Sequence, residues 1–195
     1  MKHGLAIAAA LVAGVFVFAG CSKATKSEQR SDTVVGIDDA VEISVALLRG
    51  VDAEGALSLA NKWGTGEKGV VSFVNQRFVE FEFDSGEKAS IPLPDDKMVV
   101  AIAPYVTQTH PCAIHYLSSC QGELVEIPVK VHGVTSDGEV IVDNELMTMK
   151  NGFFELWLPR DLEIDLTIEA VGKKTEGRIT TYEDSNTCIT TMQLL

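Results

Sequence analysis

Basic residues are scarce in this 195-residue chain, which has 16 lysines and arginines against 28 aspartates and glutamates and a formal net charge of −12. This deficit argues against binding to nucleic acid or to anionic lipid headgroups, because both attract positively charged surfaces. The acidic residues are spread along the chain rather than grouped. They indicate a solvated acidic surface that would raise the local concentration of cations.

Cysteine and histidine are also sparse, at four residues each. No Cys-x-x-Cys motif occurs, which argues against a thioredoxin-like redox site and against a structural zinc site built from paired motifs of that kind. The sequence has no evident internal repeat or low-complexity segment. At this length the chain can bury one substantial core or two small ones.

Long hydrophobic runs are limited to the amino terminus. The run from Leu5 to Phe18 is too short to span a bilayer comfortably, but it suits the core of a secretory signal. It ends in Phe18-Ala19-Gly20-Cys21, which resembles the lipobox of bacterial lipoproteins, with Phe where Leu is commoner. We predict a lipoprotein signal peptide over residues 1–20, lipidation of Cys21 and a flexible tether over residues 21–34. An ordinary signal peptide that ends near a cysteine is the alternative.

These features predict an extracytoplasmic protein, anchored by lipid in the periplasm or on the outer face of the cell membrane. If Cys21 carries lipid, the cysteines that remain are Cys112, Cys120 and Cys188. An odd count in an oxidising compartment indicates a free reactive thiol, an intermolecular pair or metal ligation.

Residues 35–104 are predicted to form a small α+β domain. Asp38 or Asp39 could cap a helix that ends at Gly50, and Asp52 could cap a second helix that ends near Trp63-Gly64. Alternating apolar positions then predict three strands, and a denser apolar run predicts a buried fourth. These segments are residues 71–73, 79–83, 89–93 and 99–103.

Residues 105–195 are predicted to form an all-β, transthyretin/immunoglobulin-like sandwich, so the chain as a whole is assigned to the α+β class. Short apolar alternations and turn signals follow one another here without a convincing helix. The segment from Asn151 to Pro159 resembles the strand-and-corner pattern of transthyretin-like sandwich modules.

The sharpest chemical signal is the cluster His110-x-Cys112-x2-His115-x4-Cys120. Three of its donors can converge whether the intervening residues form a hairpin connection or a helical turn. Thiolates with one imidazole match the low coordination number of Cu(I), and zinc also accepts both ligand types. A Cys112–Cys120 disulfide beside surface histidines is the structural alternative.

Sulfur recurs near the carboxyl terminus, where Cys188 and Met192 would share a face of an extended segment. Because a methionine in such a position is more often part of a core, we interpret Met192 as a packing residue, and likewise Met147 and Met149. His132 is interpreted as a surface histidine.

Three motifs carry a family resemblance. They are Ala103-Pro104-Tyr105-Val106-Thr107-Gln108-Thr109-His110 with the cluster and Ser119-Cys120-Gln121-Gly122-Glu123-Leu124, Trp157-Leu158-Pro159-Arg160-Asp161, and Thr187-Cys188-Ile189-Thr190-Thr191-Met192-Gln193-Leu194. Together they resemble the CueP family of bacterial periplasmic copper-binding, copper-resistance proteins, and the similarity covers about residues 35–195. The resemblance implies a copper chaperone or sequestering protein in which Cys112, Cys120 and Cys188 bind metal, assisted by His110 or His115. It also implies a two-domain protein that can dimerise, whereas the lipobox departs from the soluble periplasmic forms expected of the family.

The leading hypothesis is therefore a protein that captures Cu(I) through cysteine thiolates for copper resistance or delivery, and that could reduce Cu(II) in the process. The alternatives are a thiol-disulfide or copper reductase, and a lipid-anchored interaction module with a structural Cys112–Cys120 or Cys120–Cys188 disulfide. The expected partners are copper ion (with zinc as a substitute), a membrane, a second copy of the chain and a copper-accepting envelope protein. The sequence favours a metal-binding protein over an enzyme.

Overall fold

The structure is a computed structural model that describes residues 43–64 and 69–195. The predicted signal peptide, the lipidation site Cys21 and the predicted tether lie outside the described residues. Within the described segments, no helix is both long and apolar enough to cross a membrane. These segments belong to one compact unit. The predicted domain boundary near residue 105 stays a prediction.

The helical part of the described chain precedes all of its strands. In α1 (Ala53–Trp63), the side chain of Asp52 accepts a hydrogen bond from the backbone N–H of Gly55 at 2.8 Å, and Gly64 follows the last turn. The second predicted helix is thus confirmed with both of its end signals. In place of the first predicted helix, the described residues form only the 3₁₀ turn η1 (Val45–Leu48), and its predicted start lies outside them. Nearby β-branched residues disfavour a longer helix.

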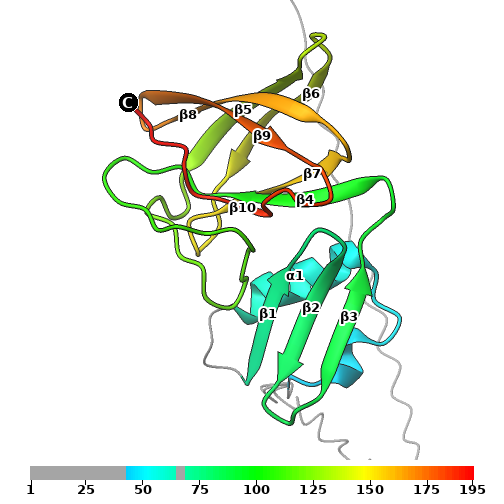
Figure 1. The fold of residues 1–195 in the computed structure, drawn as a ribbon. Coiled ribbons are helices and arrows are strands. Elements are labelled where there is room, and N and C mark those ends of the chain that lie inside the picture. Colours follow the sequence, from blue (N-terminus) through cyan, green and yellow to red (C-terminus); the bar gives the residue numbers. More distant parts are fainter. Residues whose placement is uncertain (1–42, 65–68) are drawn as a thin grey trace, which may run out of the picture. The chain divides into compact units, whose positions relative to one another are not determined.

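The first sheet consists of three antiparallel strands in the order β1 (Val70–Val74), β2 (Phe78–Phe83) and β3 (Lys88–Pro92). Helix α1 packs on one face of this sheet, where Trp63 meets Phe81 edge-on with ring centroids 5.6 Å apart (Figure 1). On β1 the fully buried positions are Val70, Ser72 and Val74, so Val71 and Phe73 of the predicted alternation lie on the opposite face.

The second sheet is built around β4 (Lys97–Ile102). On one side of β4 lies β7 (Phe154–Pro159), antiparallel, and on the other lies the short parallel strand β10 (Cys188–Ile189) (Figure 1). Every side chain from Met98 to Ile102 is buried, because residues of β4 contribute to the cores on both of its faces. The prediction of a buried strand here is confirmed.

The third sheet has four antiparallel strands in the order β6 (Val140–Met147), β5 (Pro128–Thr135), β8 (Glu163–Ala170) and β9 (Lys173–Thr180). It shares one hydrophobic core with the inner face of the second sheet, to which Val100, Phe154, Val131 and Ile168 all contribute. The described part of the chain is therefore mostly β, with one short α-helix and three sheets.

Candidate metal centre

The segment that links β4 to β5 carries four of the five predicted ligands, and β10 carries the fifth. Because β10 runs parallel to β4, Cys188 lies opposite Ala101. The carbonyl oxygen of Ala113 accepts hydrogen bonds from the N–H groups of Thr187 and Cys188, at 2.9 and 3.2 Å. These backbone contacts bring Cys188 to the donor cluster, although 76 positions separate it from Cys112.

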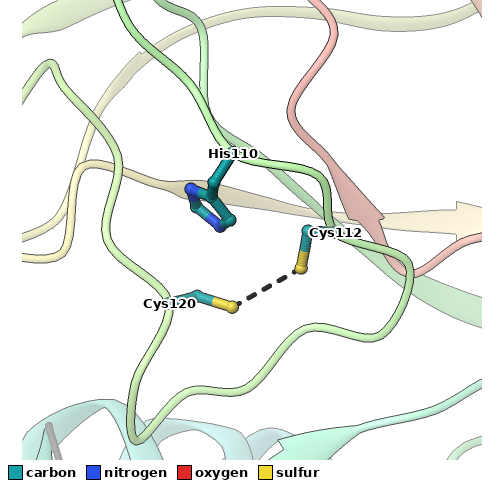
Figure 2. A group of neighbouring side chains, drawn as sticks. All are labelled: His110, Cys112 and Cys120. Atoms are coloured by element: carbon teal, nitrogen blue, oxygen red, sulfur yellow. Dashed lines mark hydrogen bonds between the residues drawn. The ribbon is translucent and has the colours of Figure 1, made fainter.

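Three sulfur atoms meet at this point. Cys112 and Cys188 form a disulfide with their Cα atoms 5.6 Å apart. Cys120 is a free, buried thiol whose Sγ lies 3.6 Å from Sγ of Cys112; Figure 2 shows these two sulfurs facing each other beside the ring of His110. The two pairings considered from the sequence, Cys112–Cys120 and Cys120–Cys188, are therefore wrong. The pairing of β10 with β4 instead places Cys188 beside Cys112.

Two overlapping sets of donors have the spacing that a metal ion needs. The first is His110, Cys112 and Cys120, and the second is His115, Cys120 and Cys188; within each set the ligand atoms all lie within 4.8 Å of one another. Cys120 belongs to both sets. All five residues predicted as ligands thus come together in one place.

His115 is the most deeply buried of these donors, with none of its surface exposed. Its backbone N–H donates to the hydroxyl of Thr187 at 3.0 Å, and its carbonyl accepts from the N–H of Val74 at 2.9 Å. Its ring packs against Phe153, with ring centroids 4.5 Å apart. The structural alternative of surface histidines beside a disulfide is wrong for His115.

The imidazole of His115 is held in its neutral form. Burial, with a smaller contribution from the charge of His110, lowers the pKa of His115 to about 4. Neither ring nitrogen has a hydrogen-bond partner among the described residues. A neutral imidazole keeps a lone pair on one nitrogen, which is the form that binds a metal.

Glu155 and Asn61 adjoin the centre and were missed from the sequence. Oε1 of Glu155 lies 3.9 Å from Nε2 of His115, and both carboxylate oxygens of Glu155 lie 3.0 Å from the donor Nδ2 of Asn61. Burial raises the pKa of Glu155 to about 7, although the hydrogen bond from Asn61 acts in the opposite direction. The sequence pattern predicts that a glutamate alternating with apolar residues in a strand faces solvent. Glu155 is largely buried because both faces of its strand are covered, which the sequence does not indicate.

The surroundings of Cys120 are apolar. Its side chain belongs to a small buried cluster with Ala101, Ala103, Phe153 and Cys188, and burial raises the pKa of its thiol. A thiol with a raised pKa keeps its proton. The proton leaves when the sulfur binds a metal ion or forms a bond with a neighbouring sulfur. The cluster therefore favours metal capture over the chemistry of an exposed, reactive thiolate.

Two glycines hold the Cys120 loop against the turn before β7. The N–H of Gly122 donates to the carbonyl oxygen of Asn151 at 2.6 Å. A Cβ atom on Gly122 would lie 2.6 Å from the carbonyl oxygen of Gly152, and a Cβ on Gly152 would lie 2.6 Å from that of Gly122. Only two glycines permit this approach, which sets Cys120 beside Phe153.

The remaining sulfur and imidazole groups have mixed outcomes. Met192 lies in the main core, so its interpretation as a packing residue is confirmed, and Met149 packs against the cysteine cluster. Met147 is 57% exposed, because it alternates along β6 with Leu146, which packs against the main core, and its interpretation as a packing residue is wrong. His132 lies at the surface as predicted, 3.4 Å from Asp143.

Acidification is expected to destabilise a Glu155→Gln variant more steeply than the unsubstituted protein. The folded-state pKa of His115 is about 4, below its ordinary 6.5, so on lowering the pH the unfolded state gains a proton first and stability falls. The folded-state pKa of Glu155 is about 7, above its ordinary 4.5, so there the folded state gains the proton first and stability rises. The two effects oppose each other between pH 6.5 and 4.5.

In the Glu155→Gln variant only the effect of His115 remains, and we expect a relative loss of about 2 kcal/mol across this window. Urea unfolding at a series of pH values measures it, with His132→Ala as the surface control. Parallel stability curves for the variant and the unsubstituted protein would contradict the opposing shifts.

Comparison with known proteins gives the centre its context. The model of the family described as periplasmic copper-binding protein CueP matches residues 62–193, which include every described residue of the centre except Asn61. A solved structure, described as the crystal structure of S.CueP, is 32% identical and has a TM-score of 0.71; the match covers 78% of this chain and 99% of that one. Among curated proteins, none matches significantly. The chain belongs to the CueP family of periplasmic copper-binding proteins.

Proposed function

We propose that this protein captures Cu(I) outside the cytoplasm with the thiolates of Cys112, Cys120 and Cys188, and that His115 or His110 completes the site. The observation that carries the proposal is the meeting of three sulfur atoms with two imidazoles at one largely buried point. Cu(I) is a soft ion that prefers thiolates and few ligands. A site that excludes water protects this valence from oxidation and strengthens each bond between thiolate and metal.

Capture requires the disulfide to be open, because a bonded sulfur is not a thiolate ligand. Reduction of the Cys112–Cys188 bond leaves three thiols in the site, those of Cys112, Cys120 and Cys188, and the sulfur of Cys120 is already 3.6 Å from that of Cys112. Copper then replaces the covalent bond as the link between the β4–β5 segment and β10. Zinc would accept the same donors but favours a fourth ligand.

Copper stoichiometry under reducing and oxidising conditions tests this function. We expect the reduced protein to bind one Cu(I) with copper–sulfur scattering in X-ray absorption, and the oxidised protein to bind it at least about 100-fold more weakly. Single Cys→Ser variants at positions 112, 120 and 188 should each lose affinity, and His132→Ala should not. Copper bound equally well by all three cysteine variants would refute the proposal.

A second function, Cu(II) reduction, is favoured by the disulfide itself. Two thiols, of Cys112 and Cys188, would give one electron each to two Cu(II) ions, which yields two Cu(I), the disulfide and two released protons. Formation of a coloured Cu(I)–chelator complex measures this step. We expect two Cu(I) per reduced protein and less than half of that yield in a Cys112→Ser/Cys188→Ser double variant, in which only the thiol of Cys120 remains; equal yields would exclude the step.

Fold, location and partners complete the proposal. The core shared by the second and third sheets supports a sandwich of the transthyretin/immunoglobulin type. The lipobox supports attachment of Cys21 to a membrane, in the periplasm or on the outer face of the cell membrane. A homodimer and an envelope protein that accepts the copper remain the proposed macromolecular partners.

A further inference from the structure

A buried polar relay runs from helix α1 to the candidate metal centre. Asn61, in the last turn of α1, donates from Nδ2 to both oxygens of Glu155 on β7. Glu155 in turn presents Oε1 to Nε2 of His115, at 3.9 Å. The His115 ring is wholly buried, and the side chain of Glu155 is 11% exposed. Neither ring nitrogen of His115 has a partner within hydrogen-bond distance among the described residues, so the 3.9 Å approach of Glu155 Oε1 to Nε2 is a close polar contact rather than a formed hydrogen bond.

We propose that Glu155, fixed by Asn61, is a positioning residue that keeps the proton of His115 on Nε2 and leaves Nδ1 as the nitrogen that binds Cu(I). This inference rests on the proposed function and assigns the imidazole of the site. It selects His115 over His110, and it selects one of the two nitrogens of His115.

The direction of the relay follows from its donors and acceptors. Asn61 uses its amide N–H groups as donors, so the carboxylate of Glu155 acts as an acceptor at both of its oxygens. The carboxylate of Glu155 can only accept hydrogen bonds, so the group that it faces in His115 is favoured as an N–H donor. The neutral imidazole of His115 has one N–H group. Placing that proton on Nε2 pairs it with Glu155 and frees the lone pair of Nδ1.

The imidazole of His115 also has two sulfur atoms as neighbours. His115 forms a donor set with Cys120 and Cys188 in which all ligand atoms lie within 4.8 Å. A metal-bound histidine commonly donates its other N–H to a carboxylate, which fixes the ring and strengthens the ligand. His110 has no such carboxylate among the contacts of the described residues, and it is only partly buried.

The proton position can be measured without a variant. Long-range ¹H–¹⁵N NMR spectra of the reduced, metal-free protein with ¹⁵N-histidine distinguish a protonated Nε2 from a protonated Nδ1. We expect the proton of His115 on Nε2, and we expect added Cu(I) to shift the Nδ1 resonance. A proton on Nδ1, or a shift confined to Nε2, would overturn the inference.

Variants then test the role of the carboxylate. Glu155→Leu removes the acceptor, and we expect a mixture of His115 tautomers and a Cu(I) affinity lower by about 10- to 100-fold. Glu155→Gln keeps an acceptor oxygen and should retain the Nε2 proton and most of the affinity, whereas Asn61→Ala should give an intermediate loss. Glu145→Gln, on the exposed face of β6, is the matched control.

The outcomes separate this inference from the function on which it rests. If the unsubstituted protein binds Cu(I) through its cysteines while Glu155→Leu leaves tautomer and affinity unchanged, only the positioning role is refuted. If the unsubstituted reduced protein binds no Cu(I), the proposed function fails and the positioning role fails with it.

Discussion

Reduction of the Cys112–Cys188 disulfide in the metal-free protein is expected to lower the free energy of unfolding by about 4 kcal/mol. The bond closes a loop across 76 positions, and in the chain-entropy description a loop of that length contributes about 4 to 5 kcal/mol by restricting the unfolded chain. Urea unfolding with and without a phosphine reductant measures the difference as a shift of the midpoint at constant slope.

Binding of Cu(I) should restore the free energy of unfolding that reduction of the disulfide removes. Copper held by all three sulfurs binds the folded chain alone, and a free concentration of about 1,000 times the Kd stabilises the folded state by about 4 kcal/mol. The Cys188→Ser variant is the control, because it should show neither the effect of reductant nor the full effect of copper. Identical midpoints for the oxidised and reduced proteins would mean that the bond does not constrain the chain.

Substitution of Gly152 by alanine is expected to destabilise the protein by about 3 kcal/mol and to weaken copper binding. Gly152 has a φ of +77°, and a Cβ atom there would lie 2.6 Å from the carbonyl oxygen of Gly122, which is backbone and cannot rotate away. The left-handed conformation costs a residue with a Cβ about 1 kcal/mol, and the steric conflict adds about 2 kcal/mol more. The displaced loop carries Cys120.

Gly138 provides a matched control for this substitution. It has a φ of +86° in the turn between β5 and β6, but nothing lies within 4 Å of the added Cβ. Gly138→Ala should therefore cost about 1 kcal/mol and leave copper affinity unchanged. Thermal unfolding and Cu(I) competition titrations distinguish the two variants, and equal losses would show that the contact between Gly122 and Gly152 has no special role.

Local signals accounted for the parts of the fold that were predicted correctly. Asp52 and Gly64 define the ends of α1 because each satisfies backbone groups within a few residues of itself. The dense apolar run of β4 indicated that both faces of this strand are buried. It did not indicate which elements cover each face. The four clustered donors were found for the same reason, since they are neighbours along the chain.

The choice of disulfide partner depends on contacts that no local pattern contains. Cys188 meets Cys112 because β10 pairs in parallel with β4 and because the carbonyl oxygen of Ala113 accepts from the N–H groups of Thr187 and Cys188. Parallel pairing joins segments that are distant in sequence, so the spacing of the cysteines carries no information about register. The sequence indicated which residues would meet, but not which two would bond.

Glu155 and Asn61 escaped prediction for a related reason. Each is a polar residue in an ordinary surface pattern of its own element, and each becomes part of the centre only when α1, β7 and the β4–β5 segment are brought together. A buried carboxylate is recognised from its surroundings rather than from its neighbours in the chain.

The position of β10 in the chain also bears on when the centre can exist. Cys188 follows β1 to β9, so the ribosome makes it after every other strand. A nascent chain that has reached β9 carries the four donors of the β4–β5 segment, which are His110, Cys112, His115 and Cys120. It lacks β10, which supplies Cys188. The complete set is therefore found only on chains whose synthesis has passed β10, and binding through all three sulfurs distinguishes these chains from shorter ones.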